Sequence, residues 1–234
     1  SSANTLHSDS ITHMTTSGNQ LLLGSSDSGL ARFDFVAGFW LSTWNSANWL
    51  TSDTIAGVER VGPTLYVLSG DALHSYNTTN GVFSTTYDLS TLGLAYDGVS
   101  LLSWPAGASA APDSDGLLVD DGSGQLVHLS PNQTPFVEGM IRLASAPATD
   151  DMTALVELDN VLYIGSGDNS MVVLRYDVGS AAWLTPLDVS DNVLDMTVAT
   201  DTAGSTTLFL AMEGSPVVEE MDPAGTVLQT YDGT

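Results

Sequence analysis

The fold of this chain is decided by an eight-residue stretch that occurs twice. It reads NTLHSDSI at residues 4–11 and NWLTSDTI at residues 48–55, so both copies match N-x-L-x-S-D-[ST]-I at a shift of 44 residues. A further shift of 44 reaches Leu94, Asp97 and Val99, and the D-x-apolar end of the pattern returns at 150–152 and 191–193. A period of this length indicates a chain built from structural repeats.

Further landmarks recur in five units of the sequence. An apolar strand is predicted to start at Leu21, Leu65, Leu117, Leu162 and Leu208. The next strand is predicted to end at Phe33-Asp34, Tyr76-Asn77, Leu129-Ser130, Tyr176-Asp177 and Met221-Asp222. Six residues later comes a large side chain, which we interpret as a core position: Trp40, Phe83, Phe136, Trp183 and Leu228.

Each unit is predicted to hold four short strands, because alternating β-branched and aromatic residues are separated by Gly, Asn, Asp and Ser clusters. In the first unit the strands are expected at 11–16, 20–25, 29–35 and 39–44. In the fourth they are expected at 152–157, 161–165, 171–177 and 182–186. No stretch shows a convincing helical period with caps.

Four strands per unit at this period predict an all-β protein, a β-propeller of five four-stranded antiparallel blades. The expected blades cover approximately residues 9–46, 53–90, 97–143, 150–187 and 191–231 of a single domain spanning 1–234. Three closures stay open: a five-bladed ring, an arc of a larger propeller, or two copies that complement each other across their open faces.

The stretch LTSDTI at 50–55, which leads to LYV at 65–67, resembles the propeller repeats in the sensor regions of hybrid two-component regulators. LLLGSSDSGLARFD at 21–34 is similar to the strand, glycine turn and strand of the same repeats. The resemblance covers nearly the whole chain. It implies the fold and, more loosely, a sensory role, because propellers host many activities.

Charge narrows the range of partners. The chain has 28 acidic residues against 4 arginines and no lysine, for a formal net charge of −24. Nucleic acid and anionic lipid surfaces are therefore poor partners, because both attract clustered Lys and Arg. No apolar run is long enough to insert into a membrane. Cysteine is absent, which excludes disulfides and thiolate-metal sites. The Ser, Thr, Asp and Gly content without lysine favours an extracellular or cell-surface location.

An acidic residue follows the second strand of most units, and we expect these turns to share one rim of the propeller. The candidates for a ligand site are Asp27, Asp71 and Asp168. Rim carboxylates could collect Ca²⁺ or a polyhydroxylated ligand. The alternative is turn chemistry, because Asp beside Gly or Ser favours tight turns. Asp53 and its counterparts before each first strand recur in every unit, which indicates a structural role.

The third unit carries a long acidic loop as a candidate metal site. Asp113, Asp115, Asp120 and Asp121 alternate with small residues in a spacing similar to a Ca²⁺ loop. The glutamate at the twelfth position of an EF-hand loop is missing, so a solvated acidic loop is the alternative. No His pair has the local spacing of a metal clip.

Three tryptophans flank predicted strand ends and connections. Trp44, Trp49 and Trp104 could stack on a sugar ring or anchor a protein partner. The alternative is packing between blades.

The sequence favours a non-catalytic binding module that holds a protein, a glycan or Ca²⁺ through its rim loops. Flanking domains or a second copy of the chain are further partners to expect. A sensory ectodomain is one alternative. A glycoside hydrolase of the five-bladed type is the other, with Glu59 and Glu157 as candidates for its carboxylate pair.

Overall fold

The computed structural model describes residues 6, 8–92, 101–104, 116–120, 125–129, 137–142, 152–167, 171–180, 182–214 and 217–232. The chain forms two compact units, Ser1–Ser103 and Trp104–Thr234, which we describe separately. The described residues are strands and turns with one short 3₁₀ turn, so the all-β prediction is confirmed. The described part of the chain contains no helix with the length and apolar character needed to cross a membrane.

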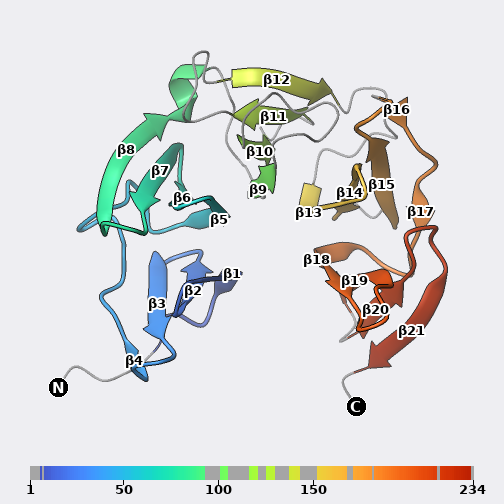
Figure 1. The fold of residues 1–234 in the computed structure, drawn as a ribbon, viewed down its shortest axis with the longest axis horizontal. Coiled ribbons are helices and arrows are strands. Elements are labelled where there is room, and N and C mark those ends of the chain that lie inside the picture. Colours follow the sequence, from blue (N-terminus) through green and yellow to red (C-terminus); the bar gives the residue numbers. More distant parts are fainter. Residues whose placement is uncertain are drawn as a thin grey trace. The chain divides into compact units, whose positions relative to one another are not determined.

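The first unit contains two antiparallel sheets, each a run of consecutive strands (Figure 1). One sheet consists of β1 (Ile11–Ser17), β2 (Gln20–Ser25), β3 (Leu30–Asp34) and β4 (Phe39–Trp40). The other consists of β5 (Ile55–Val61), β6 (Thr64–Ser69), β7 (Ala72–Asn77) and β8 (Val82–Asp88), followed by the 3₁₀ turn η1 (Leu89–Leu92). Strands β1 to β3 lie within one or two residues of their predicted positions.

The second unit contains the sheets β13–β17 and β18–β21. The first consists of β13 (Met152–Leu158), β14 (Val161–Ser166), β15 (Val172–Asp177), β16 (Ala182–Trp183) and β17 (Leu187–Asp188). The second consists of β18 (Val193–Thr200), β19 (Thr206–Met212), β20 (Val217–Met221) and β21 (Val227–Asp232). Strands β9 (Leu101–Trp104), β10 (Gly116–Asp120), β11 (Gln125–Leu129) and β12 (Val137–Arg142) form another antiparallel sheet.

The prediction of five four-stranded blades is wrong. Among the described residues, four sheets of four or five strands pack against each other in two pairs. The pairs are β1–β4 with β5–β8, and β13–β17 with β18–β21. For the β9–β12 sheet no comparable packing against another sheet is described. The structure therefore has a β-propeller-like arrangement of small sheets with four such blades. The expectation of one propeller domain over 1–234 stays a prediction.

The extra strand has a local cause. The chain after β16 continues along β15, where Leu184 donates its N–H to the Arg175 carbonyl and β17 then pairs with β15. Between the two strands Pro186 has no N–H to donate, and the side chain of Arg175 donates through Nε to the Thr185 carbonyl (2.9 Å). The outer strand is thereby split into β16 and β17.

In each pair of sheets, a glycine of one sheet lies directly under a β-branched residue of the other. In the first unit Ile55 lies over Gly24, where an added Cβ would come within 2.8 Å of Ile55 Cγ2. In the second unit Val193 lies over Gly165, where an added Cβ would come within 2.9 Å of Val193 Cγ1. The missing side chain therefore lets the first strand of one sheet approach the second strand of its neighbour closely.

A threonine hydroxyl reinforces each of these contacts. Every first strand of the four packed sheets has a register shift between its first and third residues, which is a β-bulge. At the bulge, Thr12 donates its hydroxyl to the Ile55 carbonyl (2.9 Å), and Thr153 donates to the Val193 carbonyl. The apolar residues of each pair form one core around these bonds. In the first unit they are Leu22, Leu30, Trp44, Leu50, Ile55, Val58, Leu65 and Val67.

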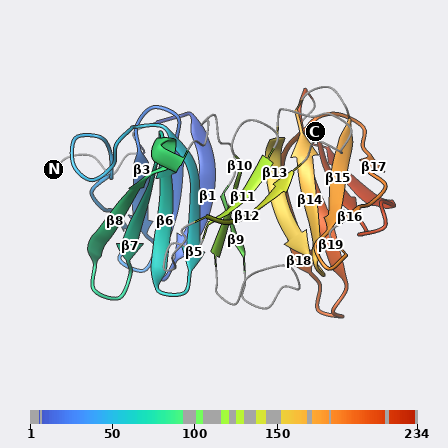
Figure 2. The same cartoon turned by 90° about the horizontal axis from the view of Figure 1, so that it is seen from above.

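Figure 2 shows the same sheets turned by 90°, with the antiparallel strands β5 to β8 side by side. The fold predicts a specific cost for filling the glycine position. We expect Gly24→Ala to destabilise the protein by about 1–3 kcal/mol in chemical denaturation, because the new methyl group overlaps the Ile55 side chain.

Ile55→Ala provides the control, since it removes the atom that the new methyl group would meet. In that background the additional cost of Gly24→Ala should largely disappear. An equal cost in both backgrounds would contradict the described packing.

Candidate functional site

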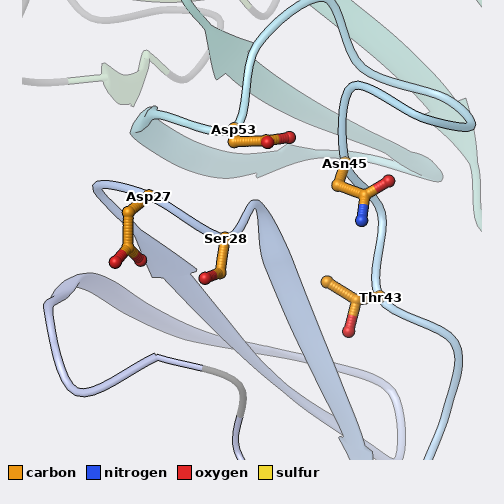
Figure 3. A pocket seen from close by; sticks show the side chains of 5 residues that line it. All are labelled: Asp27, Ser28, Thr43, Asn45 and Asp53. Carbon is orange, nitrogen blue, oxygen red and sulfur yellow. The ribbon is translucent and has the colours of Figure 1, made fainter.

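A polar cavity of about 460 Å³ lies in the first unit, beside the ends of β2 and the start of β5 (Figure 3). This volume lies within the range of small-molecule sites, about 300–1,000 Å³. Its lining combines two carboxylates, two hydroxyls and one amide, from Asp27, Asp53, Ser28, Thr43 and Asn45.

The turn between β2 and β3 presents Asp27 and Ser28, and a buried serine holds this turn. Ser25 donates its hydroxyl to the Gly29 carbonyl (2.9 Å) and accepts from the Ser28 N–H (2.9 Å). Asp27 Oδ1 accepts a hydrogen bond from the Ser8 hydroxyl (2.6 Å). That bond, and a second one from Ser28, lower the pKa of Asp27. Its carboxylate is therefore ionised at neutral pH.

The connection from β4 to β5 supplies the opposite wall. The Asn45 carbonyl accepts hydrogen bonds from the N–H groups of Asn48, Trp49 and Leu50, and its side-chain oxygen accepts from the Ala47 N–H (3.1 Å). These bonds wind the segment into a compact turn. The Asn45 amide is thereby held in a fixed place at the cavity.

Asp53 ties the two walls together. Its Oδ1 accepts from the Ser46 N–H (2.7 Å), and its carbonyl accepts from the N–H of Gly29 in the β2–β3 turn (2.8 Å). Gly29 has a φ of +83°, and a Cβ there would lie 2.2 Å from the Trp44 carbonyl oxygen, so only glycine is tolerated. Backbone hydrogen bonds therefore hold the two turns that line the cavity.

The orientations of the two carboxylates limit the chemistry of the cavity. In Figure 3 the carboxylate of Asp53 points toward Asn45, whereas that of Asp27 points in a different direction. In the described residues, no three His, Asp or Glu side chains are grouped closely enough to hold a metal ion. The lining therefore offers separate hydrogen-bonding positions rather than one cage of ligands.

A buried histidine of the second sheet binds the connection between β4 and β5. His74 of β7 is only 2% exposed, and its Nε2 accepts from the Thr51 N–H (3.3 Å). Its Nδ1 lies 3.1 Å from the Thr86 hydroxyl. Since Nε2 accepts, Nδ1 carries the proton and donates to Thr86. Burial lowers the pKa of His74, so the ring is neutral at pH 7.

Two of the predicted tryptophans and one predicted aspartate lie elsewhere in this unit. Trp44 is buried, 3% exposed, with its ring centroid 4.5 Å from Tyr76 and 4.7 Å from Phe83. Trp49 is 56% exposed and stacks on Phe83 at 5.3 Å. Asp71 is exposed in the β6–β7 turn, and its carbonyl accepts from the Leu89 N–H. Asp27 alone of the predicted ligand residues lines the cavity.

The other predicted positions are less fully described. Trp104 ends β9 and Asp120 ends β10, and only their backbone is described. Outside the described residues lie Asp113, Asp115, Asp121 and Asp168.

The candidate hydrolase carboxylates belong to different units. Glu59 lies in β5 and Glu157 in β13. Glu157 Oε1 accepts from the Asn160 N–H (2.7 Å), which holds the β13–β14 turn.

Four of the five lining residues are not predicted as ligand positions by the sequence: Ser28, Thr43, Asn45 and Asp53. The repetition of Asp53 predicts a structural residue, and its two hydrogen bonds join the turns on either side of the cavity. The sequence signal that could have pointed to these residues is their position in the connection between two repeats, because loops at strand ends of a propeller gather on one face. The contact between Gly29 and Asp53 could not be read from the sequence.

Comparison with known proteins establishes the fold alone. No protein family matches the sequence, and no curated protein matches it. Among solved structures, the chain is similar to the crystal structure of the computationally designed Ika8 protein, with a TM-score of 0.53 and 12% sequence identity. The match covers 96% of this chain and 74% of that one. At this identity the likeness supports the propeller-like arrangement and carries no function.

The neutral His74 predicts a pH dependence of stability. The pKa is lower in the folded than in the unfolded chain, so below the ordinary value of 6.5 the unfolded chain binds more protons. Stability is therefore complete above this value and is lost as the pH falls. We expect the melting temperature to drop between pH 7.5 and 5.5.

His74→Gln keeps a hydrogen-bonding side chain without the titration. In this variant the drop over the same interval should be clearly smaller, as measured by thermal unfolding with circular dichroism. An unchanged slope would show that His74 does not cause it.

Proposed function

We propose that this chain is a non-catalytic binding module that holds a polyhydroxylated ligand, such as a glycan, in the cavity lined by Asp27 and Asp53. The single observation that carries the proposal is this lining, in which Asp53 is held by the Ser46 N–H and Asp27 by the Ser8 hydroxyl. A preorganised set of this kind loses little entropy when a ligand binds.

The chemistry of the lining suits sugar hydroxyls. Each hydroxyl both donates and accepts, and the cavity offers carboxylates as acceptors, an amide as a donor, and the hydroxyls of Ser28 and Thr43 for either role. Hydrogen bonds to a charged group contribute about 1.5–3 kcal/mol each, so the two carboxylates should contribute most.

The setting of the module is part of the same proposal. The composition supports an extracellular or cell-surface location, and the resemblance to sensor propellers supports a role in which ligand occupancy is passed to a neighbouring domain. Ca²⁺ is a second ligand of the same cavity, favoured by its carboxylates and carbonyls. The diverging carboxylates of Figure 3 favour the glycan over Ca²⁺ as the ligand.

Screening on a glycan array followed by calorimetry tests the proposal. For a glycan that binds, Asp27→Asn and Asp53→Asn should each weaken the affinity by about tenfold or more, because each removes a charged acceptor. Each variant keeps the side-chain oxygen that accepts from Ser8 or from Ser46. Asp71→Asn is the matched control, because Asp71 is also an exposed turn acid but lies outside the cavity. The Asp71→Asn variant should bind the glycan with unchanged affinity.

A chelator separates the two ligands. Glycan affinity that survives chelation supports direct recognition by the side chains. Binding of Ca²⁺ alone, without any glycan, would overturn the proposal, and so would equal effects of all three variants.

A further inference from the structure

A second cavity of about 480 Å³ lies at the opposite ends of the same two sheets. The first cavity adjoins the last residue of β2, whereas this one is lined from the first residue of β2, Gln20, and from the β7–β8 turn at Thr78. The two cavities therefore share no lining residue and differ in chemistry.

Most of the lining of the second cavity is polar. Leu22, Leu65 and Trp44 reach it from the core of the unit, but they are at most 3% exposed and offer a ligand little surface. Tyr76 also lines the cavity and is partly exposed, so its ring is the main apolar surface open to a ligand.

Two residues of opposite charge also line the cavity, Asp34 from the end of β3 and Arg60 from β5. Asp34 Oδ1 accepts from the N–H groups of Val36 (3.0 Å) and Ala37 (2.8 Å), which holds its carboxylate in place. Arg60 donates through Nε to the Gly62 carbonyl (2.9 Å).

Arg60 differs from the other arginines whose side chains are described. Arg32 and Arg175 are partly buried, and they donate to the carbonyls of Ser42 and Thr185, each in the segment that follows a two-residue outer strand. Arg60 is exposed, and its described hydrogen bond, to the Gly62 carbonyl, lies within its own turn. A guanidinium in this position is suited to bind a carboxylate.

We propose that this cavity binds a zwitterionic α-amino acid. Arg60 binds the carboxylate, Asp34 binds the ammonium group, and the side chain of the ligand lies beside Tyr76. The net charge of −24 supports a zwitterion, because a free anion is repelled by the whole protein whereas a zwitterion carries no net charge.

Calorimetric titration with three compounds of one shape tests the ligand class. L-Leucine carries both charges, isocaproate lacks the ammonium group, and isoamylamine lacks the carboxylate. We expect leucine to bind at least about tenfold more tightly than either analogue. No detectable leucine binding, or equal binding of leucine and an analogue, would overturn the proposal.

Two variants test the residues. Arg60→Gln should weaken leucine binding by at least about tenfold, and Asp34→Asn, which keeps the oxygen that holds the turn, should abolish the preference for leucine over isocaproate. Asp71→Asn, outside both cavities, is the control and should bind leucine as the unaltered protein does. Circular dichroism confirms the fold of each variant. Unchanged leucine binding in Arg60→Gln would refute the assignment, whatever glycan binding at the first cavity shows.

Discussion

The contact of a β-branched side chain with the bare backbone of a glycine is the constraint on which the described packing depends. One twisted sheet cannot bury its apolar face alone, so each needs a neighbour at close range. Ile55 on Gly24 and Val193 on Gly165 provide that approach in the two units, and a threonine at the bulge fixes it. The two described cavities lie at opposite ends of the sheet pair that Ile55 and Gly24 join.

The connection from β4 to β5 turns this packing into binding sites. Trp44 sits within it, pairs with Leu30 of β3 and contributes its ring to the core. The same segment places Asn45 and Asp53 at the first cavity, and the Trp44 side chain lines the second cavity. This one connection therefore contributes both to the core between the sheets and to the lining of two cavities.

The sequence predicted those features that repeat and missed those that arise from a single contact. The starts of β2 and β14 follow from apolar runs that recur with the period of the chain, so they were found within a residue. The split of the last strand into β16 and β17 depends on Pro186 and on where the Arg175 side chain reaches, and neither repeats. The predicted number of blades was wrong for a related reason, because the recurrence of a motif does not specify how each sheet packs.

The arginines show how far such reasoning reaches into the sites. Arg32 and Arg175 each stand two residues before the end of a third strand and reach the chain ten residues further on, so their recurrence indicates structure. Arg60 has no such counterpart. In a protein with 28 acidic residues and 4 arginines, an exposed guanidinium that does not recur and that lines a cavity is the feature on which the proposed amino-acid site depends.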